Sequence, residues 1–241
     1  MNWFWNSKRD AEIKKFKLEH PVGGLIVPEN LDSLPTLGAS SEFVAPTVVD
    51  ERGHCTKTED QGATSMCAAY ATTSFAENIV WRRTQCPPSY DPVKVYQRAK
   101  ELDGDNNGGT TLPHAMQAFL DVYPDVFDKS CEPKIINCPR GNFNDLKYAI
   151  HKYGCVVGGF NITDGWYNTY KSCKGWIDVS GGFVGGHAVL CCGYNENGII
   201  IQNSWGVNFG ESGFAVLPWT AAAAQHMYSC VLKGALKNME E

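Results

Sequence analysis

The sequence of 241 residues predicts an α+β fold, with helices in its first half and strands in most of its second half. In the first half, apolar residues recur at steps of three and four, which is the period of a half-buried helix. Beyond about residue 150, the pattern changes to short β-rich runs separated by Gly, Asn and Asp turns. We therefore expect a helical lobe over about 60–145, a β-rich lobe over about 150–235, and a groove where the two lobes meet.

Residues 1–44 differ from the rest of the chain. They begin with a short charged stretch that is compatible with a helix. They continue with PVGGLIVPENLDSLPTLGASSEF, which is rich in Pro, Gly and Ser and typical of loops. We therefore treat residues 1–44 as an N-terminal extension and residues 45–241 as the main domain.

The first predicted helix of the main domain begins at Cys67. Its buried face is formed by apolar residues at helical spacing: Ala68, Ala71, Phe75 and Ile79. We expect the side chain of Thr64 or Ser65 to cap the N-terminus of this helix, because hydroxyls accept hydrogen bonds from its first N–H groups. The sequence Cys86-Pro87-Pro88 is expected to end it, since proline cannot continue a helix.

The remaining predicted elements are two helices in the first part of the chain and four strands after about residue 150. Further helices are expected over about Leu112–Leu120 and about Phe143–Tyr153. Four strands are expected: CVVGGF at 155–160, GGHAVLCC at 185–192, GIIIQNSW at 198–205 and GFAVLP at 213–218. Because neighbouring residues of a strand point to opposite faces, the adjacent Cys191 and Cys192 are expected to be buried free thiols rather than a disulfide.

Composition excludes several classes of function. The net charge of −5 and the pI near 5.7 argue against a nucleic-acid partner, which would need clustered Lys and Arg. No apolar run approaches the roughly 20 residues that a membrane-spanning helix requires. The ten cysteines include no C-x-x-C pair, which argues against a structural zinc site. We expect a monomer with no cofactor or metal.

The chemistry of the chain is expected to centre on Cys67. A helix N-terminus carries partial positive charge that stabilises a thiolate, so we expect a lowered pKa for this thiol. A nucleophilic thiol also needs a histidine as base, and His187 stands out because glycines flank its predicted strand in GGFVGGHAVL. Asn203 lies in the next predicted strand. If the two strands are antiparallel neighbours, its side-chain oxygen accepts from one ring nitrogen of His187.

Five segments of the chain, in order, resemble the papain family of cysteine peptidases. They are APTVVDERG at 45–53, QGATSMCAAYA at 61–71, NNGG at 106–109, GGHAVL at 185–190 and NSWGVNFGESGF at 203–214. The resemblance implies the papain-like two-lobe fold with an active-site groove between the lobes. It also implies that Cys67 is the nucleophile, that His187 is the acid/base and that Asn203 orients His187.

The resemblance further implies how a substrate would be held. Gln61 and the backbone N–H of Cys67 would form the oxyanion hole, and Trp205 would shield the His187–Asn203 hydrogen bond from water and border the bound substrate. Gly108 and Gly109 would present backbone groups to an extended peptide. The main specificity pocket would be formed by three small residues, Thr111, Gly159 and Ala188, and it would accept a large apolar side chain.

The chain departs from the family pattern in its cysteines. The usual C-G-S-C-W motif is replaced by the residues from Thr64 to Ala68, and Asn106 replaces the cysteine that would pair with the missing one. Cys131 matches the start of a second family disulfide without the usual partner, which leaves Cys86 and Cys138 as alternatives. Together with the lack of a secretory signal in the first residues, these changes slightly favour an intracellular location.

The resemblance predicts a cysteine endopeptidase that forms a thioester on Cys67 and takes a peptide or protein substrate. Two alternatives are a papain-fold binding protein without activity, and an acyl transferase or peptide ligase that uses the same residues. Residues 1–44 are expected to act as a short inhibitory prosegment. Its apolar piece, Leu25-Ile26-Val27-Pro28, would occupy the pocket near Gly159 and Ala188; the alternative is an arm packed on the surface or disordered.

Overall fold

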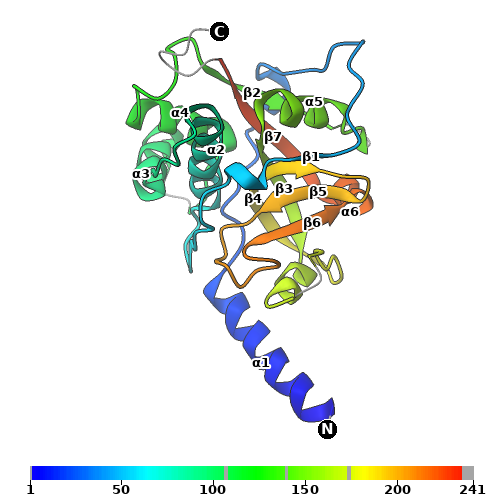
Figure 1. The fold of residues 1–241 in the computed structure, drawn as a ribbon. Coiled ribbons are helices and arrows are strands. Elements are labelled where there is room, and N and C mark those ends of the chain that lie inside the picture. The colour runs from blue at the N-terminus through cyan, green and yellow to red at the C-terminus, as the bar shows by residue number, and fades with distance from the viewer. Residues whose placement is uncertain (1, 106–107, 139–140, 173–174, 235–241) are drawn as a thin grey trace.

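The computed structural model describes residues 2–105, 108–138, 141–172 and 175–234. Helices α1 to α4 and strand β1 come first, together with two short 3-10 helices, and most of the sheet follows (Figure 1). The elements are α1 (Asn2–Glu19), η1 (Leu31–Ser33), β1 (Val49–Asp50), η2 (Arg52–His54), α2 (Cys67–Thr84), α3 (Pro92–Asp103), α4 (Leu112–Val122), β2 (Glu132–Ile136), α5 (Asn144–Tyr153), β3 (Val156–Thr163), η4 (Asp164–Thr169), β4 (Phe183–Tyr194), β5 (Gly198–Gln202), β6 (Phe214–Pro218), α6 (Trp219–Gln225) and β7 (His226–Lys233).

The seven-stranded sheet is antiparallel and runs in the order β2-β7-β3-β4-β5-β6, with the short β1 paired to β4. Helices α2, α3 and α4 group together beside it, as Figure 1 shows. This arrangement agrees with the predicted α+β class and with its two lobes. All four predicted strands are present, as β3, β4, β5 and β6.

Three strands, β1, β2 and β7, and two helices, α3 and α6, were not predicted. β7 lies inside the sheet, between β2 and β3, and β2 lies at the sheet edge although its residues fall within the range assigned to the helical lobe. Pro133 is tolerated in β2 because a strand at the edge of a sheet has a free side. Of the two missed helices, α3 has a recognisable start: the Asp91 side chain accepts from the backbone N–H of Val93, and Pro92 occupies the first turn.

Helix α2 begins at Cys67 as predicted, but its N-terminus lacks the predicted side-chain cap. The N-cap residue is Met66, and the hydroxyl of Thr64 instead donates to the backbone carbonyl of Gln61 at 2.7 Å. In the described chain, no side-chain hydroxyl therefore occupies the first backbone N–H groups of the helix, and they remain available to the sulfur of Cys67. The helix ends at Thr84, just before Cys86-Pro87-Pro88, and Gln85 follows in the left-handed conformation with a φ of 56°.

The cysteine predictions can be followed on strand β4. Cys191 and Cys192 are both buried free thiols. Their sulfur atoms have different neighbours: a methyl group at Gly158 would lie 2.6 Å from the Cys191 sulfur, whereas the Cys192 thiol donates to the backbone carbonyl of Ile200. Cys86 and Cys138 are free as well, so neither is a disulfide partner of Cys131. Asn106 lies outside the described residues.

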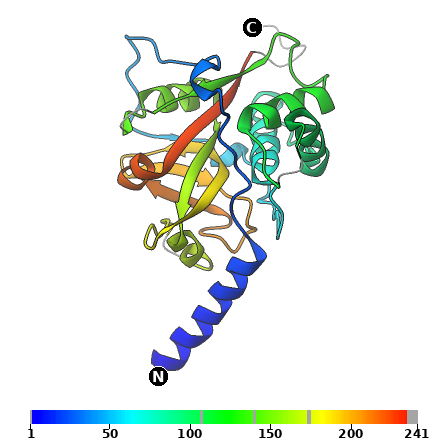
Figure 2. The same cartoon turned by 180° about the vertical axis from the view of Figure 1, so that it is seen from behind.

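The N-terminal extension has two parts. Helix α1 projects from the body of the molecule at the bottom of Figure 1. The chain that follows it, dark blue in Figure 2, passes between the helices and the sheet. It then runs beside β2, where the backbone N–H of Ile135 donates to Pro35 and the N–H of Leu37 donates to Ile135, both at 2.8 Å. In the described part of the chain, no helix is long and apolar enough to cross a membrane.

Candidate active site

Cys67 is the first residue of α2 and is almost fully buried, with 1% of its surface exposed. Burial raises the pKa of its thiol to about 11, although the backbone N–H groups of Ala188, Ala68 and Cys67 itself lower it. The predicted lowering of this pKa is therefore wrong for this structure. The helix N-terminus acts in the expected direction, but loss of water around the sulfur has the larger effect.

His187 and Asn203 are brought together as the strand pattern predicted. β4 and β5 are antiparallel neighbours, and the Nε2 atom of His187 lies 2.8 Å from the Oδ1 atom of Asn203. Oδ1 also accepts from the backbone N–H of Ser204 at 2.8 Å, which fixes it as an acceptor. The hydrogen of the neutral imidazole therefore sits on Nε2, and Nδ1 keeps its lone pair.

The imidazole of His187 is in a desolvated setting. Burial lowers its pKa to about 4, and the hydrogen bond to Asn203 only partly opposes this effect. Nδ1 is buried and has no hydrogen-bond partner among the described residues. Cys67 and His187 are thus both neutral near pH 7. The thiol hydrogen-bonds with the backbone N–H of Ala188, the residue directly after His187.

Trp205 covers the His187–Asn203 pair. Its ring centroid lies 4.7 Å from that of His187, and its side chain is fully buried. On its other faces, Tyr167 stacks on it at 5.0 Å with nearly parallel planes, and Phe16 of α1 approaches its edge at 6.0 Å. This geometry suits the predicted shielding of the hydrogen bond. The expected contact of Trp205 with a bound substrate stays a prediction, because Phe16 already occupies part of its surroundings.

Gln61 lies on the loop before α2 and is held tightly. Its side-chain Nε2 donates to the carbonyl of Thr64 at 2.8 Å, and its Oε1 accepts from the hydroxyl of Ser204 at 2.7 Å. The amide therefore has one N–H left to offer to a ligand. Because Ser204 follows Asn203 directly, this contact ties the expected oxyanion donor to the His187–Asn203 pair.

Residues 22–26, which we call the covering segment, bind by backbone hydrogen bonds between the two lobes. On the helical side, Thr110 donates to the carbonyl of Gly24 and accepts from the N–H of Ile26, both at 3.0 Å. On the sheet side, the N–H of Gly23 donates to the carbonyl of Gly186 at 3.0 Å. The pairing of Leu25 with Thr110 is parallel.

The side chain of Leu25 enters the pocket that the small residues were expected to form. A methyl group at Gly159 would lie 2.6 Å from Cδ2 of Leu25 and 3.7 Å from Cδ1 of Leu112. Ala188 of β4 pairs with Gly159 of β3. Thr111, the residue after Thr110, caps the N-terminus of α4. Leu25 is 5% exposed, so the pocket accommodates an apolar side chain of that size.

The glycines of this region act differently from the prediction. On the helical side, the backbone groups that pair with the covering segment belong to Thr110, not to Gly108 or Gly109. Gly109 instead provides room: a methyl group there would lie 2.9 Å from the carbonyl oxygen of Gly24. The carbonyl of Gly108 accepts from the hydroxyl of Tyr96 at 2.7 Å. Gly109 thus lets the covering segment come close to the helical lobe, and the hydrogen bonds to that segment are made by the next residue, Thr110.

Gly24 lies directly over the thiol. A methyl group on it would come within 3.0 Å of the Cys67 sulfur and 2.6 Å of the backbone carbonyl oxygen of Ser65. Any side chain here would therefore clash with the site. The covering segment excludes water from Cys67 because only the bare backbone of glycine fits, and this close cover accounts for part of the burial that raises the thiol pKa.

Two contacts of the covering segment were missed by sequence reasoning. The hydroxyl of Tyr228, on β7, donates to the carbonyl of Ile26 at 2.7 Å and accepts from the N–H of Leu112 at 3.0 Å. Thr110 carries no motif of its own, and only its place after NNGG points to it. Within the described ranges, no cluster of three or more His, Cys, Asp or Glu residues is arranged to hold a metal ion.

Comparison with known proteins finds cysteine proteases that are similar to this chain. A family model described as papain family cysteine protease matches residues 128–231. Mouse cathepsin S is 25% identical over 227 residues, covering 80% of this chain and 64% of that protein. Papaya proteinase 4 from Carica papaya is 25% identical over 243 residues, covering 89% of this chain and 68% of that protein. The chain thus spans about two thirds of the length of these relatives.

Solved structures share the fold. Xylellain, a cysteine protease from Xylella fastidiosa, superposes with a TM-score of 0.71 at 18% identity, covering 90% of this chain and 96% of that one. A recombinant stem bromelain precursor superposes with a TM-score of 0.66 at 18% identity, covering 92% of this chain and 80% of that one. The fold is therefore the papain-like α+β fold. The matching family model and the curated relatives show that the chain is similar to papain-type cysteine proteases.

Proposed function

We propose that this chain is a cysteine peptidase that hydrolyses peptide bonds through a thioester on Cys67, with His187 as acid/base. The observation that carries this proposal is the hydrogen bond of 2.8 Å between His187 and Asn203, next to a thiol at the N-terminus of α2. An acid/base held by a third residue beside a nucleophile is the arrangement that acyl transfer requires.

The proposed reaction begins when His187 Nδ1 takes the proton of the Cys67 thiol and the sulfur attacks a peptide carbonyl. The free N–H of Gln61 and the backbone N–H of Cys67 would then stabilise the oxyanion. His187 would give its proton to the leaving amine. Water activated by neutral His187 would then hydrolyse the thioester and restore the thiol.

We also propose that residues 1–44 are an inhibitory prosegment. The parallel pairing of Leu25 with Thr110 supports this role, because a segment paired in parallel runs opposite to a substrate that binds as an antiparallel added strand. A peptide in the reversed direction covers the thiol without presenting a carbonyl for productive attack. Stem bromelain, a structural neighbour of this chain, was likewise solved as a precursor.

The charge state of the covered site supports the same proposal. With the thiol pKa at about 11 and the imidazole pKa at about 4, thiolate and imidazolium are both disfavoured while the segment is bound. Departure of the segment would return water to both groups. The thiol pKa would then fall and the imidazole pKa would rise, which favours the reactive ion pair.

A pair of variants tests the peptidase assignment. Cys67→Ala and His187→Ala should each abolish hydrolysis of a fluorogenic peptide carrying a leucine two residues before the cleaved bond. Asn203→Ala should be milder, because packing under Trp205 preserves part of the orientation of His187. Undiminished hydrolysis by Cys67→Ala would overturn the assignment. Product analysis with an added amine separates hydrolysis from peptide ligation.

A further inference from the structure

A small, partly enclosed cavity of about 10 Å³ lies beside Asn203, with walls from α2 and from the sheet. Its apolar walls are formed by Ala71 of α2 and Val189 of β4. Its polar walls are formed by Glu59, Ser74, Gln202, Asn203 and Ser204. The volume is close to the smallest that holds one water molecule. A cavity of this size with polar walls is suited to a bound water rather than to an organic ligand.

Three buried polar atoms of this wall have no hydrogen-bond partner in the described chain: Nδ2 of Asn203, Oε1 of Gln202 and Oε2 of Glu59. The opposite ends of both amides are engaged. Oδ1 of Asn203 accepts from His187 and from the backbone of Ser204, both at 2.8 Å. Nε2 of Gln202 donates to the carbonyl of Thr56 at 2.8 Å and to the hydroxyl of Thr58 at 3.2 Å. Neither amide can therefore be turned around without losing two hydrogen bonds.

The three atoms form a complementary set of one donor and two acceptors. A water molecule accepts one hydrogen bond from an amide N–H and donates two to oxygens. Bound in the cavity, it would accept from Asn203 and donate to Gln202 and to Glu59. All three buried groups would then be satisfied, as buried polar groups in folded proteins generally are.

We propose that one buried water molecule links Glu59 to Asn203 and Gln202, and that Glu59 is a positioning residue for the His187–Asn203 pair. The catalytic part of this inference rests on the proposed peptidase function. Through the water, the carboxyl of Glu59 holds the Nδ2 end of Asn203, so that Oδ1 stays directed at the imidazole. The orientation of His187 then depends on a residue that touches neither the thiol nor a substrate.

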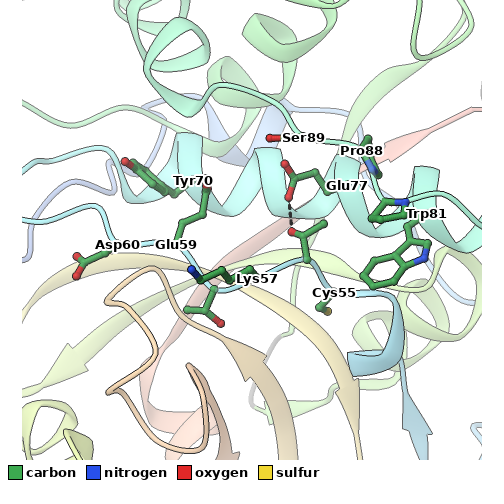
Figure 3. Close-up of a pocket in the computed structure, with 12 residues that line it drawn as sticks. Cys55, Lys57, Glu59, Asp60, Tyr70, Glu77, Trp81, Pro88 and Ser89 are labelled. Atoms are coloured by element: carbon green, nitrogen blue, oxygen red, sulfur yellow. Dashed lines mark hydrogen bonds between the residues drawn. The ribbon is translucent and has the colours of Figure 1, made fainter.

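Glu59 also reaches the outer surface of the protein. It lines a larger open pocket of about 750 Å³ that Tyr70, Glu77 and Trp81 of α2 border (Figure 3). Burial, followed by the charges of Glu77 and Asp91, raises the pKa of its carboxyl to about 7. Both forms of the carboxyl keep an oxygen that accepts from the water. Glutamine has the same shape and also keeps one, so it should replace glutamate at this position.

The test compares Glu59→Ala with Glu59→Gln and with Lys57→Ala in the full-length chain. Lys57 is the matched control because it is exposed and lines the outer pocket, but not the cavity. A crystal structure of the unsubstituted chain at about 1.5 Å resolution should show a water within hydrogen-bond distance of Glu59, Gln202 and Asn203. An empty cavity, or one closed by contacts among these side chains, would overturn the proposal.

A second readout follows the imidazole directly. In protein labelled with ¹⁵N-histidine, the Nε2–H signal of His187 should exchange with solvent at least about tenfold faster in Glu59→Ala, since the Nδ2 end of Asn203 is then held less firmly. The same signal should be unchanged in Glu59→Gln and Lys57→Ala. Equal exchange in Glu59→Ala and the unsubstituted chain would refute the positioning role. Neither readout depends on peptidase activity, so the proposal can fail separately from the proposed function.

Kinetics give the third readout, in the full chain with Leu25→Asp added to release the covering segment. Glu59→Ala should lower kcat about tenfold, which is less than the roughly 10²-fold effect of a 1 Å misplacement. KM should change less than twofold, because the cavity does not meet the expected substrate path. Glu59→Gln should restore kcat. A loss that appears only in KM, or that glutamine does not restore, would contradict the role of Glu59.

Discussion

The two parts of the N-terminal extension hold to the body in different ways. Helix α1 is attached by exposed ion pairs, such as Lys17–Asp164 and Glu12–Lys171, and by the buried ring of Phe16, which stacks on Tyr170. The covering segment is instead attached by main-chain hydrogen bonds and by the buried side chain of Leu25. Surface ion pairs contribute about 0–1 kcal/mol, and burying an apolar side chain such as Phe16 or Leu25 contributes about 1.5–3 kcal/mol. The covering segment therefore differs from α1 chiefly in its main-chain hydrogen bonds beside the thiol. We infer that the covering segment closes the site and that α1 chiefly guides it there.

The largest effect is expected from Leu25→Asp. A carboxylate in the pocket beside Gly159 loses the apolar contact and is buried without a partner, which costs at least about 2 kcal/mol. The rate of Cys67 alkylation by iodoacetamide in the full chain should therefore rise roughly 30-fold or more. Val27→Asp is the matched control, because Val27 is two residues away and 40% exposed. An equal rise in both variants would show that the pocket contact is not what closes the site.

Gly24→Ala should have the next largest effect. The added methyl group meets the carbonyl of Ser65 at 2.6 Å and the Cys67 sulfur at 3.0 Å, so the segment must move away from the thiol. Overpacking of this kind costs about 1–3 kcal/mol, which corresponds to roughly a tenfold rise in the alkylation rate. Gly38→Ala is the control, since no atom lies within 4 Å of a methyl group there. Slower alkylation in Gly24→Ala would mean that the methyl group tightens the cover.

Acid should weaken the closed arrangement through His187. Its folded pKa of about 4 lies below the ordinary 6.5, so the unfolded or open state binds more protons between these values. The contribution of this residue to stability is therefore lost as the pH falls from about 6.5 to about 4. Over this range, the melting temperature of the full chain should drop several degrees more than that of His187→Gln. Parallel curves for the two proteins would exclude this role of the imidazole.

The smallest effect is expected on α1. Lys17→Ala removes the ion pair with Asp164, whose side chains are 46% and 50% exposed. Because such exposed pairs contribute about 1 kcal/mol or less, alkylation of Cys67 should rise less than about fivefold, and salt should reduce the difference. A rise as large as that of Leu25→Asp would shift the closing role from the covering segment to the helix.

The parts of the site that the sequence could predict are those with local signals. Cys67 begins a helix with apolar residues at helical spacing. His187 lies on β4 and Asn203 directly follows β5, the next strand, so antiparallel pairing makes them neighbours. The small residues near Leu25 could likewise be identified from their segments. The proximity of His187 and Asn203 needed only adjacent pairing, the commonest outcome for successive strands.

The parts that could not be predicted depend on contacts between distant segments. Tyr228 reaches the covering segment only because β7 inserts between β2 and β3, an order that no local pattern gives. The pKa of Cys67 was predicted in the wrong direction because the helix N-terminus is local, whereas the burial comes in part from Gly24, far away in sequence. The role of Thr110 was missed because it pairs through its backbone N–H and carbonyl, which every residue type except proline carries.

The most direct test of the account removes residues 1–44 and measures two rates, peptide hydrolysis and alkylation of Cys67, against the full chain. If the extension closes a competent active site, both rates should rise at neutral pH, and Cys67→Ala in the shortened chain should abolish hydrolysis. Circular dichroism of the shortened chain would establish that it remains folded. If the folded, shortened chain shows both rates unchanged, the central claim that residues 1–44 cover a catalytic thiol is contradicted.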